Sequence, residues 1–238
     1  MSRLKLFAFP YAGGSSSIYN GLRPLLDDQI EFIPVELAGR GRRIGEDLYP
    51  DLNAAVDDLY KIVSPQIGFS QFAFFGHSMG SLLAHQLAKR LKEELGVSPS
   101  HIFFSGRGAL QMNIEKEKKY HQMSEQQFKD EVLLLGGTPP EFFQHPELLE
   151  LFLPLLRNDF RIAETAPSID GFNKEGVDIT VFTGREDDHT EEQIAGWNDY
   201  TTGSCEIHTF EGGHFFIHQE MDAIARIINS TIDQLVIK

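Results

Sequence analysis

Cysteine and long apolar runs are both scarce in this chain, which narrows the classes of protein to consider. A single cysteine, Cys205, excludes an internal disulfide, and no stretch of the 238 residues is apolar over the length of a membrane span. The N-terminal sequence MSRLKLFAFP lacks the apolar core and the cleavage site of a signal peptide. We therefore expect a cytoplasmic protein without a membrane partner, and the length suits one domain, residues 1–238.

Positive charge is also in short supply. Lysine and arginine total 21 against 35 aspartates and glutamates, a formal net charge of −14, and a surface of that sign repels the phosphates of nucleic acid. The exception is GRGRR, where Arg40, Arg42 and Arg43 are clustered. Two interpretations stay open: a solvated loop with structural ion pairs, or a phosphate contact near the mouth of a site, since arginine binds phosphate well.

Motifs for metals and nucleotides are absent too. The chain contains no HExxH, no paired CxxC and no Walker A sequence, and GRGRRIG lacks the spacing of a dinucleotide-binding turn. We therefore expect neither a metal nor a cofactor.

What the chain does contain is a series of short apolar runs rich in β-branched and aromatic residues. Most are almost continuously apolar, as are strands that are covered on both faces of a parallel sheet. Helical patterns separate them, and the clearest has Leu83, Leu87 and Leu91 at four-residue intervals and a stop at Gly96. This alternation predicts an α/β fold with a doubly wound, mostly parallel sheet flanked by helices. The expected strands are residues 4–9, 30–35, 72–75, 101–105, 178–183 and 205–210.

Residues 109–172 interrupt this alternation. No strand is convincing there, and SEQQFKDEVLLLGG and HPELLELFLPLLRNDFRIAE read as helices rich in leucine and phenylalanine. The segment is long for a simple connection, so we expect a helical lid inserted in the α/β core, with apolar faces toward a substrate cavity. The alternative is a set of ordinary helices that cover the sheet.

The sequence FFGHSMGSLLAH places Ser78 in a G-x-S-x-G pentad between an expected strand and the leucine-striped helix. That setting is typical of a nucleophile elbow, in which small neighbours allow a tight turn that lifts the serine hydroxyl above the sheet. The turn also directs the first N–H groups of the helix at the reaction centre. We therefore predict that Ser78 is a nucleophile, whereas the adjacent His77 points elsewhere and is a poor base.

A serine hydroxyl needs a general base, and the base needs a carboxylate that orients it. His214 is the strongest candidate base, because FEGGHFF follows the last expected strand on a glycine turn and can reach back to the elbow. VFTGREDDHT follows the preceding strand and offers Asp187 as the acid, with Asp188 as second choice and His189 beside them. The order Ser78, Asp187, His214 is that of the α/β-hydrolase fold.

The same chemistry needs N–H donors for the oxyanion that forms on the substrate. One is expected from the backbone of Met79, directly after the nucleophile. The second is expected from FPYAGGSSSIY at the end of the first strand, where Gly13 and Gly14 permit a close backbone approach. The donor there is Ala12 or Tyr11.

Seven sequence blocks follow one another across nearly the whole chain: FPYAGGSSSIY, ELAGRGRR, FFGHSMGSLLAHQLAKRL, LLRNDFRIAE, VFTGREDD, GW at 196–197 and FEGGHFF. In order and spacing they resemble the type II thioesterases, the stand-alone editing enzymes of nonribosomal peptide and polyketide synthases. One departure is Ala38, where that family often has proline before the first glycine of the basic loop.

The resemblance implies an α/β-hydrolase fold with a helical lid. It also implies hydrolysis of acyl thioesters on the 4′-phosphopantetheine arm of carrier proteins, which clears stalled or mis-primed acyl groups. By motif, Ser78, Asp187 and His214 match the nucleophile, acid and base, and Ala12 and Met79 match the oxyanion donors. The expected partners are acyl- or peptidyl-carrier protein domains, and the enzyme is expected to be a monomer. Phosphopantetheine belongs to the substrate, so the enzyme itself needs no cofactor.

The resemblance also favours a functional interpretation of Arg40, Arg42 and Arg43, as contacts for the pantetheine phosphate or for an acidic carrier protein. Other functions of the same triad stay open. They are a general carboxylesterase or lipase, an acyltransferase that passes the acyl group to an acceptor other than water, and a hydrolase-fold protein that binds a ligand without catalysis.

Overall fold

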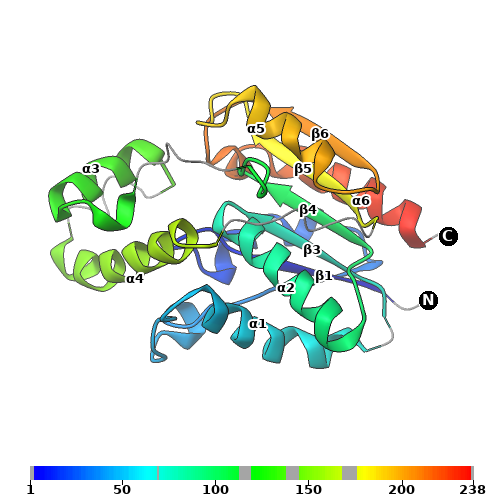
Figure 1. Ribbon diagram of the computed structural model, residues 1–238, viewed down its shortest axis with the longest axis horizontal. Coiled ribbons are helices and arrows are strands. Elements are labelled where there is room, and N and C mark those ends of the chain that lie inside the picture. The colour runs from blue at the N-terminus through cyan, green and yellow to red at the C-terminus, as the bar shows by residue number, and fades with distance from the viewer. Residues whose placement is uncertain (1–2, 69, 113–118, 138–144, 168–175, 237–238) are drawn as a thin grey trace.

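A computed structural model of the chain describes residues 3–68, 70–112, 119–137, 145–167 and 176–236. Within these residues a parallel sheet has the strand order β2-β1-β3-β4-β5-β6 (Figure 1). The strands are β1 (Leu4–Phe9), β2 (Ile30–Pro34), β3 (Phe72–His77), β4 (His101–Ser105), β5 (Asp178–Gly184) and β6 (Cys205–Phe210). The helices are α1 (Leu52–Ile67), α2 (Met79–Leu95), α3 (Glu125–Leu135), α4 (Pro146–Glu164), α5 (Glu191–Ala195) and α6 (Met221–Val236). The predicted strands and the α/β class are confirmed.

Helices cover both faces of the sheet, because alternate residues of each strand point to opposite sides. On one face Phe7 and Phe74 pack in a cluster with α1 and α2. On the other face Leu6 and Phe75 pack with the buried side of α6. Both alternate sets are therefore apolar, which explains why the strands read as continuous apolar runs in the sequence.

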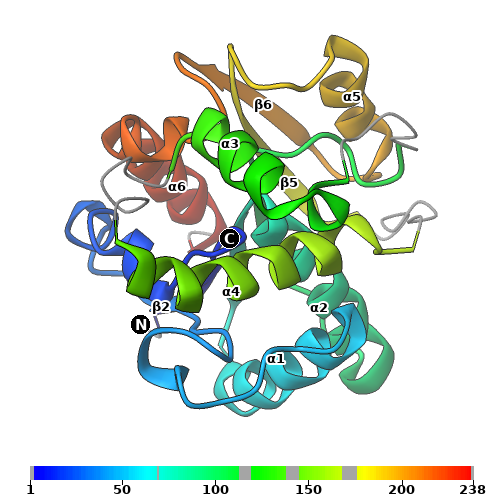
Figure 2. The same ribbon diagram turned by 90° about the vertical axis from the view of Figure 1, so that its left-hand side faces the viewer.

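Helices α3 and α4 follow β4 and precede β5 in the chain, and they lie beyond the carboxyl ends of the strands (Figures 1 and 2). They share a small apolar cluster of their own, which includes Phe128 and Val132 of α3 and Leu153 of α4. Of the expected lid, residues 109–172, the ranges 113–118, 138–144 and 168–172 lie outside the described residues. No helix in the described part of the chain is long and apolar enough to cross a membrane.

The turn from β3 into α2 brings three backbone segments into close contact. A Cβ on Gly76 would lie 2.2 Å from the carbonyl oxygen of Gly80, and a Cβ on Gly80 would lie 2.0 Å from the carbonyl oxygen of Phe9 in β1. Real Cβ atoms do not approach backbone atoms that closely. Glycine at both positions therefore lets α2 begin directly against β1 and β3.

We predict that Gly80→Ala lowers the free energy of unfolding by about 3 kcal/mol or prevents folding, because the Phe9 carbonyl belongs to the backbone of β1 and accepts the buried Tyr19 hydroxyl at 2.7 Å, so it cannot move aside freely. Gly45→Ala is the matched control, since no heavy atom lies within 4 Å of the Cβ it would add. Denaturant unfolding of the two variants and the wild type measures the difference. Equal stability of the two variants would contradict the close contact at Gly80.

Candidate active site

Ser78 lies at the tip of the turn between β3 and α2, in a backbone conformation that residues other than glycine rarely adopt. Its φ of 53° is the one positive value among the non-glycine residues that the structure describes. The Ser78 N–H donates to the carbonyl of Ser105 at 2.7 Å, and the Ser81 hydroxyl donates to the carbonyl of Gly76 at 2.8 Å. Such strain costs about 1–3 kcal/mol and persists only where neighbours hold it. These two bonds attach the turn to β4 and to its own strand.

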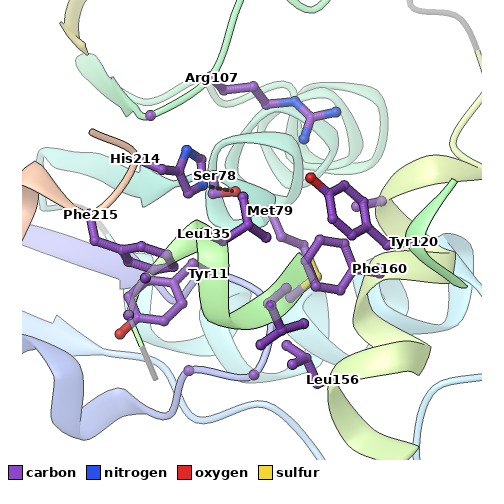
Figure 3. Close-up of a pocket in the computed structure, with 18 of the residues that line it drawn as sticks. Tyr11, Ser78, Met79, Arg107, Tyr120, Leu135, Leu156, Phe160, His214 and Phe215 are labelled. Carbon is purple, nitrogen blue, oxygen red and sulfur yellow. Dashed lines mark hydrogen bonds between the residues drawn. The ribbon is translucent and has the colours of Figure 1, made fainter. Parts of the chain in front are cut away.

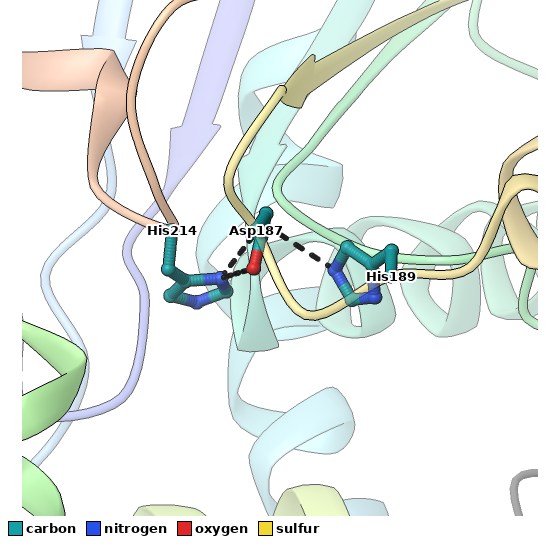
Figure 4. A group of neighbouring side chains, drawn as sticks. All are labelled: Asp187, His189 and His214. Carbon is teal, nitrogen blue, oxygen red and sulfur yellow. Dashed lines mark hydrogen bonds and ion pairs between the residues drawn. The ribbon is translucent and has the colours of Figure 1, made fainter.

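The structure brings three of the predicted site residues together from the ends of three strands: Figure 3 shows His214 beside Ser78, and Figure 4 shows His214 beside Asp187. The Nε2 of His214, which follows β6, lies 3.0 Å from the Oγ of Ser78. The Nδ1 of His214 lies 3.1 Å from each carboxylate oxygen of Asp187, which follows β5. A serine, an imidazole and a carboxylate in this chain of hydrogen bonds have the geometry of a serine-hydrolase triad.

The carboxylate of Asp187 is suited to orient an imidazole. Burial opposes its ionisation, but the hydrogen bond from His214 and the neighbouring imidazoles outweigh burial and hold the pKa of Asp187 below its ordinary value. The backbone N–H of Asp188 adds a bond of 2.9 Å to Asp187 Oδ1. Asp187 is therefore ionised at neutral pH and keeps the Nδ1 proton of His214 in place, while Asp188 contributes its backbone.

Two other histidines lie close to this group but face different partners. His77 is fully buried and its Nδ1 lies 2.8 Å from the hydroxyl of Ser105, away from Ser78. Burial lowers its pKa well below the ordinary value, so the ring is neutral. His189 lies on the side of Asp187 opposite to His214, with its Nε2 3.5 Å from the carboxylate (Figure 4). Neither ring is placed between Ser78 and Asp187 as His214 is.

Asp187, His189 and His214 are also the residues, within the described ranges, whose donor atoms lie close enough together to hold a metal ion. Their donor atoms are all within 4.8 Å of one another. Two imidazoles and a carboxylate suit zinc. However, a metal there would occupy the Nδ1 of His214 in place of its proton, and so would displace the hydrogen bond that orients the imidazole. The arrangement is better explained by the triad.

The two expected oxyanion donors line the pocket that contains Ser78. Met79 is the first residue of α2, and the first N–H groups of a helix have no partner within the helix. Ala12 belongs to the loop that follows β1, residues 10–15, which we call the β1 loop. Both residues line the same pocket as Ser78 and His214. The backbone at both positions is therefore close to where a substrate carbonyl would sit.

The pocket above Ser78 has a volume of about 670 Å³. Apolar side chains of α3 and α4 form one wall, including Leu135, Leu156 and Phe160 (Figure 3), and Phe152 lines the same pocket. Phe215, next to His214, lies on the other side of the nucleophile. A pocket of this size and lining suits a flexible apolar chain attached to the reacting carbonyl.

The three arginines of GRGRR have three different environments, and structural ion pairs, one of the two interpretations left open by the sequence, account for Arg40 and Arg43. Arg40 is 3% exposed and pairs with Asp159 of α4 through two hydrogen bonds of 2.6 and 2.8 Å. Arg43 is half-buried and pairs with Glu46 and Asp58. Arg42 is exposed and, in the described part of the chain, has no ion-pair partner. Burial and these bonds inside the fold keep the Arg40 guanidinium from contact with a carrier protein.

No motif in the sequence points to Asp159, although the block LLRNDFRIAE contains it. A signal was present: Phe152, Leu156, Asp159, Phe160 and Ala163 recur at the spacing of one helix face, and the acid interrupts that otherwise apolar row. A charge within a buried apolar row requires a partner of opposite charge. The neighbouring sequence does not show which residue that partner is.

The fold is of the α/β-hydrolase type, and the hydrogen bonds among Ser78, His214 and Asp187 have the geometry of a catalytic triad. A model of the thioesterase domain matches residues 4–232. Linear gramicidin dehydrogenase LgrE of Brevibacillus parabrevis is 35% identical over 98% of this chain and 89% of its own length. The medium-chain S-acyl fatty acid synthase thioesterase of Rattus norvegicus is 35% identical over 90% and 81%.

Solved structures are similar over the same extent. The crystal structure of ClbQ from the colibactin NRPS/PKS pathway matches with a TM-score of 0.92 and 31% identity, covering 99% of both chains. One relative is named a dehydrogenase, whereas the family model and the rat relative are thioesterases. The chain belongs to the thioesterase family.

We predict that Asp187→Asn lowers kcat for a simple ester by about 10⁴, because an amide cannot hold His214 in the tautomer that accepts the serine proton. Asp188→Asn is the matched control and should change kcat by less than about tenfold, since only its backbone N–H meets the site. Steady-state hydrolysis of a nitrophenyl ester measures both. A larger loss in Asp188→Asn than in Asp187→Asn would reassign the acid.

Proposed function

We propose that this protein is a stand-alone type II thioesterase that hydrolyses acyl thioesters on the 4′-phosphopantetheine arm of carrier proteins and so removes stalled or mis-primed acyl groups. The observation that carries the proposal is the hydrogen-bonded chain from Ser78 through His214 to Asp187 at the floor of an apolar pocket. Membership of the thioesterase family supports the thioester as the bond that is cleaved. The name of ClbQ's pathway supports a synthase as the setting.

The reaction follows from the positions of the three side chains. The Oγ of Ser78 attacks the thioester carbonyl while the Nε2 of His214 takes its proton, and the carboxylate of Asp187 stabilises the imidazolium. The backbone N–H groups of Ala12 and Met79 hold the oxyanion. The C–S bond then breaks, and His214 returns the proton to the departing thiol. Water, deprotonated by His214, releases the acid from the acyl-serine and restores Ser78.

We further propose that α3 and α4 act as the lid of this site. Their apolar side chains form one wall of the pocket, and both helices lie beyond the carboxyl ends of the strands, where the nucleophile is (Figure 2). The acyl chain would lie against Phe152, Leu156 and Phe160, and the arm would leave the pocket toward solvent. The enzyme needs no cofactor for these steps, since every proton is moved by His214.

The proposed function predicts a clear order of substrates. Acetyl-phosphopantetheinyl carrier protein should be hydrolysed with a kcat/KM at least roughly tenfold above acetyl-CoA and a nitrophenyl acetate, because protein contacts add binding energy that the small substrates lack. Ser78→Ala should abolish turnover of all three. If the carrier protein gives no advantage and the simple ester is preferred, the protein is a general esterase. Transfer of the acyl group to an added alcohol instead of water would indicate an acyltransferase.

Arg42 is the remaining candidate for contact with an acidic carrier protein, because the chain as a whole carries a charge of −14. We predict that Arg42→Glu raises the apparent KM for the carrier substrate about three- to tenfold, more strongly at low salt, and leaves nitrophenyl ester hydrolysis unchanged. Lys89→Glu, the same charge change at a side chain 55% exposed on α2, is the control. Equal effects of the two variants would mean that net charge, and not Arg42, determines carrier binding.

A further inference from the structure

A buried ion pair joins helix α4 to the β1 loop, where an oxyanion donor is expected. Asp159 of α4 is 1% exposed and Arg40 is 3% exposed. Besides its two bonds to Arg40, the carboxylate accepts the backbone N–H of Gly13 at 2.8 Å. Arg40 in turn donates to the carbonyl of Gly14 at 3.2 Å. Asp159 and Arg40 therefore bind each other and also two consecutive residues of the loop, Gly13 and Gly14.

These bonds restrict the orientation of the peptide that carries the Ala12 N–H. The Tyr11 carbonyl accepts the N–H of Gly14 at 2.9 Å, so it points into the loop. In a trans peptide the N–H points opposite to the carbonyl, and therefore the Ala12 N–H points out of the loop. Asp159 and Arg40 fix Gly13 and Gly14, which close this turn. The direction of the donor thus depends on a carboxylate in α4.

Apolar contacts bring α4 to the same place. A Cβ on Gly13, whose φ is +78°, would lie 2.7 Å from Leu156 and 3.0 Å from Phe152, so α4 rests directly on the loop. The residue directly after the loop has a separate attachment, since Ser16 donates its N–H and its hydroxyl to Glu36, each at 2.9 Å. Asp159 is therefore specific to the middle of the loop, where the donor is.

We propose that Asp159 is a positioning residue for catalysis: with Arg40, it couples the seating of α4 to the formation of the oxyanion hole. When α4 rests on the loop, the Gly13 N–H has its acceptor and the Ala12 N–H is directed at the oxyanion. When α4 leaves, the loop loses both bonds. This inference rests on the proposed acyl transfer at Ser78, but not on the carrier protein as substrate.

Asp159→Asn keeps the size of the side chain but presents an amide to Arg40 and so weakens the hold on the loop. We expect kcat for a nitrophenyl ester to fall 10- to 100-fold with KM nearly unchanged, since a complete loss of one oxyanion donor costs about 10²–10³. A trifluoromethyl ketone, which forms an oxyanion on Ser78, should bind more weakly by the same factor. A stable thioether analogue of the substrate, which has no oxyanion, should bind as it does to the wild type.

Asn158→Ala is the matched control for α4 itself. Asn158 is the neighbour of Asp159 and donates to the carbonyl of Tyr49 at 3.1 Å, so it also attaches α4 to the core, but it does not touch the β1 loop. This variant should lose stability without a selective loss of affinity for the ketone. The thermal midpoint of each variant is measured beside its kinetics.

A double variant, Arg40→Met with Asp159→Leu, separates the packing of α4 on the β1 loop from the positioning of the Ala12 N–H. Replacement of a buried ion pair by apolar residues of similar volume is often neutral or stabilising. The double variant should therefore fold with α4 in place, yet show the low kcat and the weak ketone binding, because the Gly13 N–H has lost its acceptor.

Wild-type kcat and ketone affinity in the double variant would overturn the proposal, as would parallel changes in Asp159→Asn and Asn158→Ala. A rise in KM without a fall in kcat would also overturn it, because that result indicates lost ground-state binding. A wild-type protein that neither hydrolyses the ester nor binds the ketone would contradict the proposed function as well. A wild type active on esters but indifferent to carrier protein would leave that part of the function wrong and this test intact.

Discussion

Backbone contact at Gly80 is the constraint on which the rest of the site depends. Because α2 begins directly against the end of β1, the nucleophile at Ser78, the first N–H of α2 and the β1 loop all meet within a few residues of that contact. Contacts between main-chain atoms, which pack rigidly, set the spacing of these three groups. Side chains only add to these contacts. An enzyme that must hold an oxyanion to within fractions of an ångström gains from such an arrangement, since backbone donors cannot rotate away.

The sequence predicted the sheet, and the proximity of Ser78, Asp187 and His214 at one edge of it, because these signals are local. Strands buried on both faces are apolar throughout, whatever they pack against, and a parallel sheet places the ends of β3, β5 and β6 at one edge. Ser78, Asp187 and His214 each follow one of those strands, so topology alone brings them near one another. The preference for Asp187 over Asp188 agrees with the geometry, in which Asp187 faces the imidazole.

The burial and the ion pairs of the three arginines in GRGRR could not be predicted in the same way. Three arginines within four residues look alike in a sequence, but their environments depend on which segments pack there. Arg40 pairs with Asp159, which lies 119 residues away in α4. The sequence near either residue does not show that α4 packs against the basic loop. Arg43 is satisfied by acids close to it in the chain, and Arg42 is left at the surface. Charge is visible locally, whereas burial is a property of the assembled fold.

A buried pair has a consequence that apolar packing alone would not have. Phe152 and Leu156 line the pocket and touch the β1 loop, and such contacts weaken gradually as a helix shifts. The Arg40–Asp159 pair behaves differently, because separation would leave two buried charges and the Gly13 N–H without partners, at a cost of about 3–5 kcal/mol. Partial displacement of α4 is therefore unfavourable. The apolar wall is then free to adapt to different acyl chains, while the proposed coupling keeps the position of α4 on the loop, and with it the expected donor at Ala12, fixed.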